Sequence, residues 1–282
     1  MPKVNLERVY GAASREIRDE LRAIDLLKFD NAQAEAIQRK VRRLTLALDL
    51  AAEEWADTDL AASYARGAAR ARVALEILGK KPRHQVTSQL INMQDKALET
   101  LIEANISIRL TVDDFLQAFL AGAQTARSAQ VQEFDRRKTL QKFEELGEEA
   151  VAAEISRGEL GRQIIDFLKR QIDEDGLILV KGKYWDARKY AKLVARTEIR
   201  KAQTEATKDS CRQYDNDLVW VAPHGTICDI CMPLEDGDGV FSLSGKDPIY
   251  PPLPVEIPAH PNCQHSMSPT SHTAIGIASR RK

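Results

Sequence analysis

The sequence lacks an apolar run long enough to cross a membrane. It also lacks an excess of charge of either sign, with 41 Lys and Arg against 42 Asp and Glu in 282 residues. The first absence predicts a protein without a membrane-spanning helix. The second leaves no overall electrostatic field that would favour nucleic acid or a membrane surface as a partner. The N-terminus lacks the apolar stretch of a signal peptide, so we expect the chain to stay in a cytoplasm.

Cysteine is scarce, and three of the four cysteines stand in two short clusters. Cys228 and Cys231 form a C-x-x-C in "TICDIC", and Cys263 lies between His260 and His265 in "HPNCQH". Because thiols stay reduced in a cytoplasm, such clusters favour a metal site over a disulfide.

Zinc takes four ligands in a tetrahedron, most often thiolates and imidazoles. The C-x-x-C supplies two of them, and the second cluster supplies Cys263 with either His260 or His265. A redox C-x-x-C is the alternative, but the "CMPLEDGDG" stretch is a poor start for the helix that such a motif needs. The H-E-x-x-H and H-x-E patterns of catalytic zinc sites are absent, and three cysteines with one histidine close the coordination shell. We therefore predict a structural zinc ion.

Residues 1–175 carry apolar side chains at three-four spacing, which predicts helix almost throughout. The expected helices cover 4–27, 32–78 and 88–104, with one more from Thr111, where T-x-x-D resembles a capping box, and one from Ser156. After Gly176 we expect a strand in "LILVK", a helix over 187–213 capped by Asp186, and short strands in "LVWV" and "VFSL". The expected fold class is α+β, mostly α, with a long helical N-terminal region followed by a small zinc-stapled α+β C-terminal domain.

Charge is unevenly distributed over the C-terminal part of the chain. Residues 187–213 contain eight Lys and Arg against three acids, whereas residues 214–265 contain one Lys against eight carboxylates. Pairing of the basic helix with the acidic module is the expected arrangement, because the acidic module would be repelled by phosphates. Contact between helix 187–213 and DNA is the alternative.

Several motifs occur in an order that resembles a known family. They are "GLILVKGKYWDARKYAKLVARTEIRKAQTEA", the Trp of "LVWVAP", "TICDICMPLEDGDGVFSL", "PPLP" and "HPNCQH". The series resembles the C-terminal domain of Mu-F-like minor capsid proteins, which act in head morphogenesis of tailed phages. That family pattern ends in H-P-x-C-R-C, and His265 stands where its last cysteine would be. The resemblance therefore supports a ligand role at this position and leaves His260 and His265 as alternatives for the fourth zinc ligand.

The resemblance implies a head morphogenesis domain with the zinc module at 156–268, a helical region at 1–155 that docks on the portal or capsid, and a flexible tail at 269–282. It implies a structural protein of the virion, made in the host cytoplasm, that acts in head assembly, DNA packaging or DNA ejection through the portal. The expected partners are the portal and the major capsid protein, with packaged DNA as a possible contact of helix 187–213. Neither a membrane, a small-molecule substrate nor an enzymatic activity is expected.

Arg196 and Glu198 match the R-T-E of the same family. Two residues apart on a helix, they do not share a face and cannot pair with each other. We expect each to pair elsewhere and to fix the helix against the zinc module.

An enzyme is the competing hypothesis, because nuclease and ADP-ribosyl transferase domains are sometimes fused to Mu-F-like modules. An HNH-type nuclease would need a further catalytic His and Asn beside the zinc scaffold, and His224 is the single candidate, without an evident partner. A transferase would need more chain than the short tail provides. The acidic module argues against a DNA-binding regulator.

Overall fold

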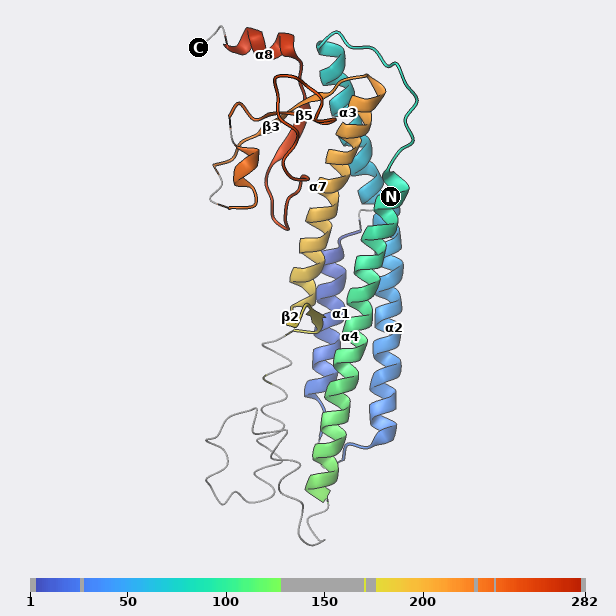
Figure 1. Ribbon diagram of the computed structural model, residues 1–282. Coiled ribbons are helices and arrows are strands. Elements are labelled where there is room, and N and C mark those ends of the chain that lie inside the picture. The colour runs from blue at the N-terminus through green and yellow to red at the C-terminus, as the bar shows by residue number, and fades with distance from the viewer. Residues whose placement is uncertain are drawn as a thin grey trace. The chain divides into compact units, whose positions relative to one another are not determined.

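The computed structural model describes residues 4–279 apart from 26–27, 128–169, 171–175, 226–227 and 236, and Figure 1 shows its elements. The chain forms two compact units. Unit 1 consists of Met1–Tyr10, Leu48–Glu103 and Arg188–Lys282, and unit 2 consists of Gly11–Ala47 and Ala104–Ala187. Each unit thus combines segments that lie far apart in the sequence. The domain boundary expected at residue 155 and the helix expected from Ser156 lie outside the described residues.

Long helices supply most of the described structure: α1 (Leu6–Arg22), α2 (Asn31–Trp55), α3 (Ala61–Ile77), α4 (Leu90–Arg127) and α7 (Ala187–Gln213). A π-helical segment, η1 (Ala56–Leu60), joins α2 to α3, so the helix expected over 32–78 is continuous but changes its winding. There the Thr58 hydroxyl donates to the Glu54 carbonyl oxygen, and Ser63 donates to that of Asp59. Among the described residues, no helix is both long enough and apolar enough to cross a bilayer.

Helix α4 corrects the expectation of two helices, one over 88–104 and one from Thr111. The structure has a single helix through this region, and Thr111 is buried in its interior. The buried stripe of Ala104, Ile108 and Val112 runs across the supposed boundary without a change of spacing. The T-x-x-D pattern was therefore not a cap, because a continuous apolar face outweighs a local capping signal.

Unit 2 has a core of buried aliphatic and aromatic side chains contributed by its parts of α1, α2 and α4 and by the Phe29 loop. The rings of Phe29 and Phe119 meet edge to face with centroids 6.1 Å apart. The expected strand in "LILVK" is confirmed as β1 (Ile178–Val180), which pairs antiparallel with β2 (Lys183–Trp185). Asp186 directly precedes α7, as expected, and also accepts a hydrogen bond from Arg18 at 3.0 Å.

Unit 1 places α7 directly against α3. A Cβ atom added to Gly67 of α3 would lie 2.8 Å from both the Cα and the carbonyl oxygen of Gln203 on α7. The phenol of Tyr64 on α3 donates a hydrogen bond to Asp209 on α7, and both residues are buried. The two helices therefore approach at backbone distance, and glycine is the residue that permits it.

A three-stranded antiparallel sheet of order β4-β3-β5 completes unit 1. β3 (Leu218–Ala222) and β4 (Val240–Ser242) are the strands expected in "LVWV" and "VFSL", and β5 (Ser266–Pro269) pairs with the other edge of β3. The sheet's core consists of Cys211, Val219, Val221, Leu234, Phe241 and Ile257. The α+β class, mostly helical with small sheets in the C-terminal part, is thus confirmed.

The flexible tail expected at 269–282 includes a helix. Residues His272–Ser279 form helix α8. The Ser271 hydroxyl accepts a hydrogen bond from the backbone N–H of Ala274 at 3.3 Å, as an N-cap does, and Nε2 of His272 lies 2.8 Å from a carboxylate oxygen of Asp247. Composition alone did not indicate this helix, its cap or the contact between His272 and Asp247.

Candidate metal centre

The two cysteine clusters lie in two loops next to the three-stranded sheet. Cys228 and Cys231 stand between β3 and β4, in a turn where the N–H groups of Cys231 and Met232 both donate to the Cys228 carbonyl oxygen at 2.9 Å. A short 3-10 helix, η3 (Met232–Leu234), follows this turn. Cys263 lies in the second loop, just before β5, where its N–H donates to the His260 carbonyl oxygen at 3.0 Å. These turns aim the side chains of both clusters at one place.

The sulfur and nitrogen atoms of both clusters lie at coordination spacing. Nε2 of His260 is 3.0 Å from Sγ of Cys231 and 3.4 Å from Sγ of Cys228. Sγ of Cys231 is 3.8 Å from Sγ of Cys263, which in turn is 3.6 Å from Nδ1 of His265. Ligand atoms at about 2.0–2.3 Å from a tetrahedral zinc ion are separated by about 3.3–3.8 Å. Three of these distances lie in that range, and the distance from His260 to Cys231 is shorter. The three cysteines and two histidines therefore form a cluster that could hold a metal ion, with Cys231 shared by two ligand groups.

Each imidazole has its second nitrogen held by an oxygen. Nδ1 of His260 lies 2.7 Å from the Pro261 carbonyl oxygen, and Nε2 of His265 lies 3.0 Å from Oε1 of Glu235. Metal-ligating histidines are commonly oriented in this way by a carbonyl or carboxylate partner. Both histidines thus satisfy the geometry of a ligand, and the choice between His260 and His265 that the sequence left open stays open.

Burial shapes the chemistry of these groups. Cys231, Cys263 and His265 are buried and Cys228 is half-buried. Burial, together with the adjacent thiols of Cys263 and Cys228, raises the pKa of Cys231 to about 12. Burial also lowers the pKa of His265, so its imidazole is neutral, which is the form that binds metals. A metal cation bound beside Cys231 would favour its thiolate, which is the form of cysteine that binds metals.

A sequence model of one protein family, described as Phage minor capsid protein 2, matches residues 79–271. The chain belongs to this family. The match spans more than half of the chain and includes the whole metal cluster. Searches of curated proteins and of solved structures gave no match.

Membership of the Phage minor capsid protein 2 family confirms the expected kinship with phage minor capsid proteins. It makes the chain a structural protein of the phage head and places it in the virion.

Glu235 is a residue of this minor capsid protein that the sequence did not single out. It belongs to the "EDGDG" stretch, which resembles an ordinary solvated turn, yet it holds His265 and accepts a hydrogen bond from the backbone N–H of His224 at 3.0 Å. The rings of His224 and His265 lie 4.2 Å apart. His224, Glu235 and His265 form a further group with ligand spacing. In the sequence, Glu235 is a single Glu between Leu234 and a glycine-rich turn. Such a residue is too common to predict a role in the site.

The two family-matched charges of α7 have different surroundings. Glu198 is 7% exposed and pairs with Lys201 of the same helix at 2.6 Å. Arg196 is exposed and lines a cavity, and over the described residues the structure gives it no ion-pair partner. Among the described residues, neither Arg196 nor Glu198 is hydrogen-bonded or ion-paired to the metal cluster.

The basic helix α7 meets the acidic module at Lys208. This buried lysine bonds to Glu256 of the module and to Glu205 of its own helix. Burial would lower the pKa of Lys208, but the two carboxylates together outweigh it and raise that pKa. At the N-terminal end of the helix, Arg188 and Lys192 pair with Glu7 at 2.7 and 3.1 Å. Glu256 of the acidic module and Glu7 of α1 thus neutralise part of the excess positive charge of α7.

Proposed function

We propose that this minor capsid protein is a structural component of the phage head whose C-terminal module is held together by one zinc ion. The proposed ligands are Cys228, Cys231, Cys263 and either His260 or His265. The observation that carries this proposal is that these sulfur and imidazole atoms gather in two ligand groups that share Cys231, with neighbouring atoms 3.0–3.8 Å apart, close to the separations in a tetrahedral site. A thiolate-rich set of this kind suits zinc, and three sulfurs with one nitrogen leave no open position for catalysis.

The metal would stabilise the C-terminal module, which consists of the acidic stretch 214–265 and β5. Its strands are only three to five residues long, and its apolar core is small. Strands this short need additional support for independent stability. A zinc ion that ties the β3–β4 loop to the loop before β5 would supply it.

Elemental analysis of freshly purified, reduced protein tests the zinc proposal. One equivalent of zinc per chain is expected, and less than half an equivalent would contradict it. His260→Ala and His265→Ala, made separately, should differ, since only the ligand variant should lose the metal. If neither variant lowers the zinc content, the fourth ligand lies elsewhere.

We further propose that the helices dock the protein on the portal or the shell, after synthesis in the bacterial cytoplasm, and that it serves head assembly, packaging or ejection. Exposed large apolar side chains support this, because they recur at i, i+4 spacing on three helices: Leu46 and Leu50, Val73 and Ile77, Ile106 and Leu110. Apolar pairs on a helix surface are a usual feature of protein interfaces. Contact of α7 with packaged DNA is a further part of the proposal.

Head incorporation of the full chain tests the docking proposal. Leu46→Gln with Leu50→Gln, and Ile106→Gln with Leu110→Gln, should each reduce the amount of protein in purified heads assembled with the other head proteins of the phage. Asp95→Asn with Glu99→Gln, an exposed i, i+4 pair on α4, is the matched control. Full incorporation of both apolar variants would place the docking surface elsewhere.

A metal-dependent nuclease is the second candidate, and the group of His224, Glu235 and His265 beside the cysteine cluster favours it. A reactive metal bound there would need His224, which is exposed and accessible to a substrate. Reproducible metal-dependent DNA nicking by pure protein, abolished by His224→Ala, would support this candidate. An ADP-ribosyl transferase would be indicated by consumption of NAD. We expect neither activity.

A further inference from the structure

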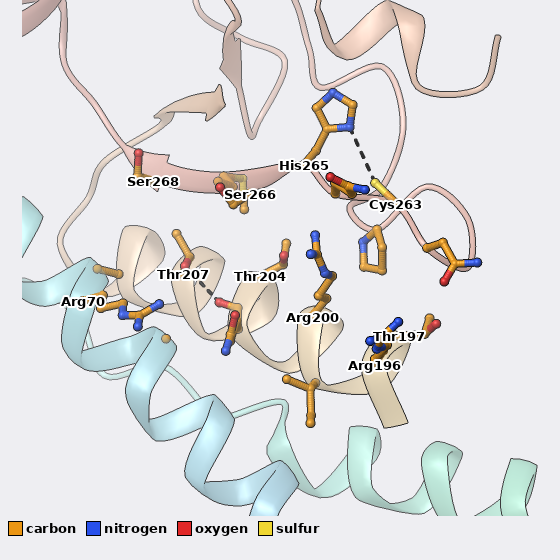
Figure 2. A pocket seen from close by; sticks show the side chains of 18 of the residues that line it. Arg70, Arg196, Thr197, Arg200, Thr204, Thr207, Cys263, His265, Ser266 and Ser268 are labelled. Atoms are coloured by element: carbon orange, nitrogen blue, oxygen red, sulfur yellow. Dashed lines mark hydrogen bonds between the residues drawn. The ribbon is translucent and has the colours of Figure 1, made fainter. Parts of the chain in front are cut away.

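A cavity of about 820 Å³ lies within unit 1, between α3, α7 and the stretch that includes β5. Figure 2 shows its cationic side chains, with Arg196 and Arg200 on α7 and Arg70 on α3. Arg196 and Arg200 are one helical turn apart and therefore share a face. Arg70 and Arg196 are exposed, and Arg200 is half-buried, so all three are accessible to a ligand from solvent.

These three arginines are not neutralised within the part of the chain that the structure describes. No ion-pair partner is found there for Arg70, Arg196 or Arg200, whereas Arg188, Lys201 and Lys208 of α7 all have carboxylate partners. The described residues that line the cavity include no Asp or Glu. Three guanidinium groups around a space without a carboxylate create a positive potential that an anion would neutralise.

The opposite wall of the cavity is the edge strand β5. All four residues of β5 line the cavity, although successive side chains of a strand point to opposite faces. The strand must therefore present its backbone edge as well as its side chains. Since β5 is at the end of the sheet order, one of its edges has no strand partner. The Thr270 N–H bonds to Leu218 of β3, so every second residue back along the strand also faces β3, and Met267 and Pro269 face outward. Proline has no N–H, so Met267 supplies the one backbone donor of that edge. The hydroxyls of Thr204, Ser266 and Ser268 add further donors.

We propose that this cavity binds the phosphodiester backbone of DNA. Arginine forks, hydroxyls and backbone N–H groups are the set of donors that proteins use for phosphate oxygens. Among the described lining residues, His265 is the one aromatic side chain, and it belongs to the metal cluster; they include no Phe, Tyr or Trp on which a base could stack. Binding is therefore to phosphates, independent of base sequence. These residues specify how α7 would make the DNA contact proposed above. This proposal rests on the proposed function only in taking the DNA to be the packaged DNA of the phage.

Salt-dependent DNA binding by the full-length, zinc-loaded protein tests this proposal. The probes are a single strand and a duplex, each of random sequence, measured by fluorescence anisotropy at several salt concentrations. For the duplex, the slope of log affinity against log salt concentration should become less steep by about 2 to 3 in the triple variant Arg70→Gln, Arg196→Gln, Arg200→Gln. Relative to 1 M salt, this change of slope corresponds at 0.1 M salt to a loss of affinity of about 100- to 1,000-fold. The probe, single strand or duplex, that shows the larger change in slope is the form of DNA that the cavity binds.

A matched control variant removes the same charge elsewhere. Arg15→Gln, Arg43→Gln and Arg72→Gln affect exposed helical arginines outside the cavity and should leave the slope within about 1 of the wild type. The triple Arg→Lys variant at the cavity retains the charge and should retain the slope, which separates loss of charge from loss of folding.

Three outcomes would overturn the proposal. The first is an equal change in slope for the cavity and control variants, and the second is loss of slope in the Arg→Lys variant. The third is polyglutamate binding that depends on the three arginines while DNA binding does not, which would identify an acidic peptide as the occupant. Head incorporation is measured separately, and the Gln variant should still enter heads. Failure of the wild type to enter heads would contradict the proposed function without affecting this result.

Discussion

Gly67→Ala probes the backbone contact between α3 and α7 that organises unit 1. The new Cβ would lie 2.8 Å from the Cα and the carbonyl oxygen of Gln203 and 3.1 Å from Cβ of Ala206. Carbon atoms in favourable contact are about 3.5–4.0 Å apart, so the helices must separate by several tenths of an ångström. The obstructing atoms belong to backbone and cannot rotate away.

Two effects of opposite sign decide the result. Alanine in place of glycine favours a helix by about 1 kcal/mol. Overpacking of a close contact costs about 1–3 kcal/mol, and a backbone obstruction places this case at the upper end. We therefore expect the variant to lose about 2 kcal/mol in free energy of unfolding, measured by urea denaturation with circular dichroism.

Two further variants make the test specific. Ala69→Gly, at an exposed position of the same helix, should lose about 1 kcal/mol through helix propensity alone. Gln203→Ala combined with Gly67→Ala should not restore stability, because the clash involves backbone atoms of Gln203 and not its side chain. A Gly67→Ala variant that is more stable than the wild type would refute the close helix contact.

Other predictions concern the buried polar groups of unit 1. Burial, and then the bond to Asp209, raises the pKa of Tyr64 to about 12. The raised pKa means that the neutral phenol stabilises the fold below pH 10 and that this stability is lost as the pH rises from 10 to 12. Tyr64→Phe should thus be less stable by about 1–2 kcal/mol at pH 9, and a urea series in which this difference stays constant up to pH 12 would contradict the assignment. Lys208→Ala should cost about 1–3 kcal/mol, because it removes a buried stem and leaves two carboxylates facing each other. Glu256→Gln should cost less than about 1 kcal/mol, since that side chain is 78% exposed, and equal losses for the two variants by urea denaturation would count against a buried role for Lys208.

The sequence predicted the elements whose signals are local. Helix α7 begins directly after Asp186 and ends at Gln213, as the capping residue and the change to "LVWV" indicated. The metal cluster was predictable because C-x-x-C and H-x-x-C each close within one turn. Helix α4 was misjudged at Thr111, where a local capping pattern competed with an apolar stripe that continues on both sides.

Features that depend on distant segments could not be predicted from the sequence. Gly67 gives no local signal, because its role comes from the backbone of Gln203, far along the chain. Glu235 gains its partner His265 only when two loops meet. The cavity likewise combines Arg70 of α3 with residues of α7 and β5. Such sites require the tertiary fold, since neither charge nor periodicity along one segment indicates them.

Cys211 allows a direct test of the central claim that a metal ion holds the C-terminal module together. This thiol is fully buried in the sheet core, where burial raises its pKa to about 12, and it does not belong to the metal cluster. Leu234, which ends the short helix after Cys231, packs in the same core. Loss of the metal should therefore free Leu234 and expose Cys211.

The decisive measurement is the alkylation rate of Cys211, read by mass spectrometry on native protein before and after removal of zinc with a chelator. Our account predicts that Cys211 is protected while zinc is bound and that it reacts after chelation at nearly the rate found in denatured protein. Addition of zinc should restore protection. Continued protection of Cys211 after complete loss of zinc would show that the module is folded without the metal and would contradict the account.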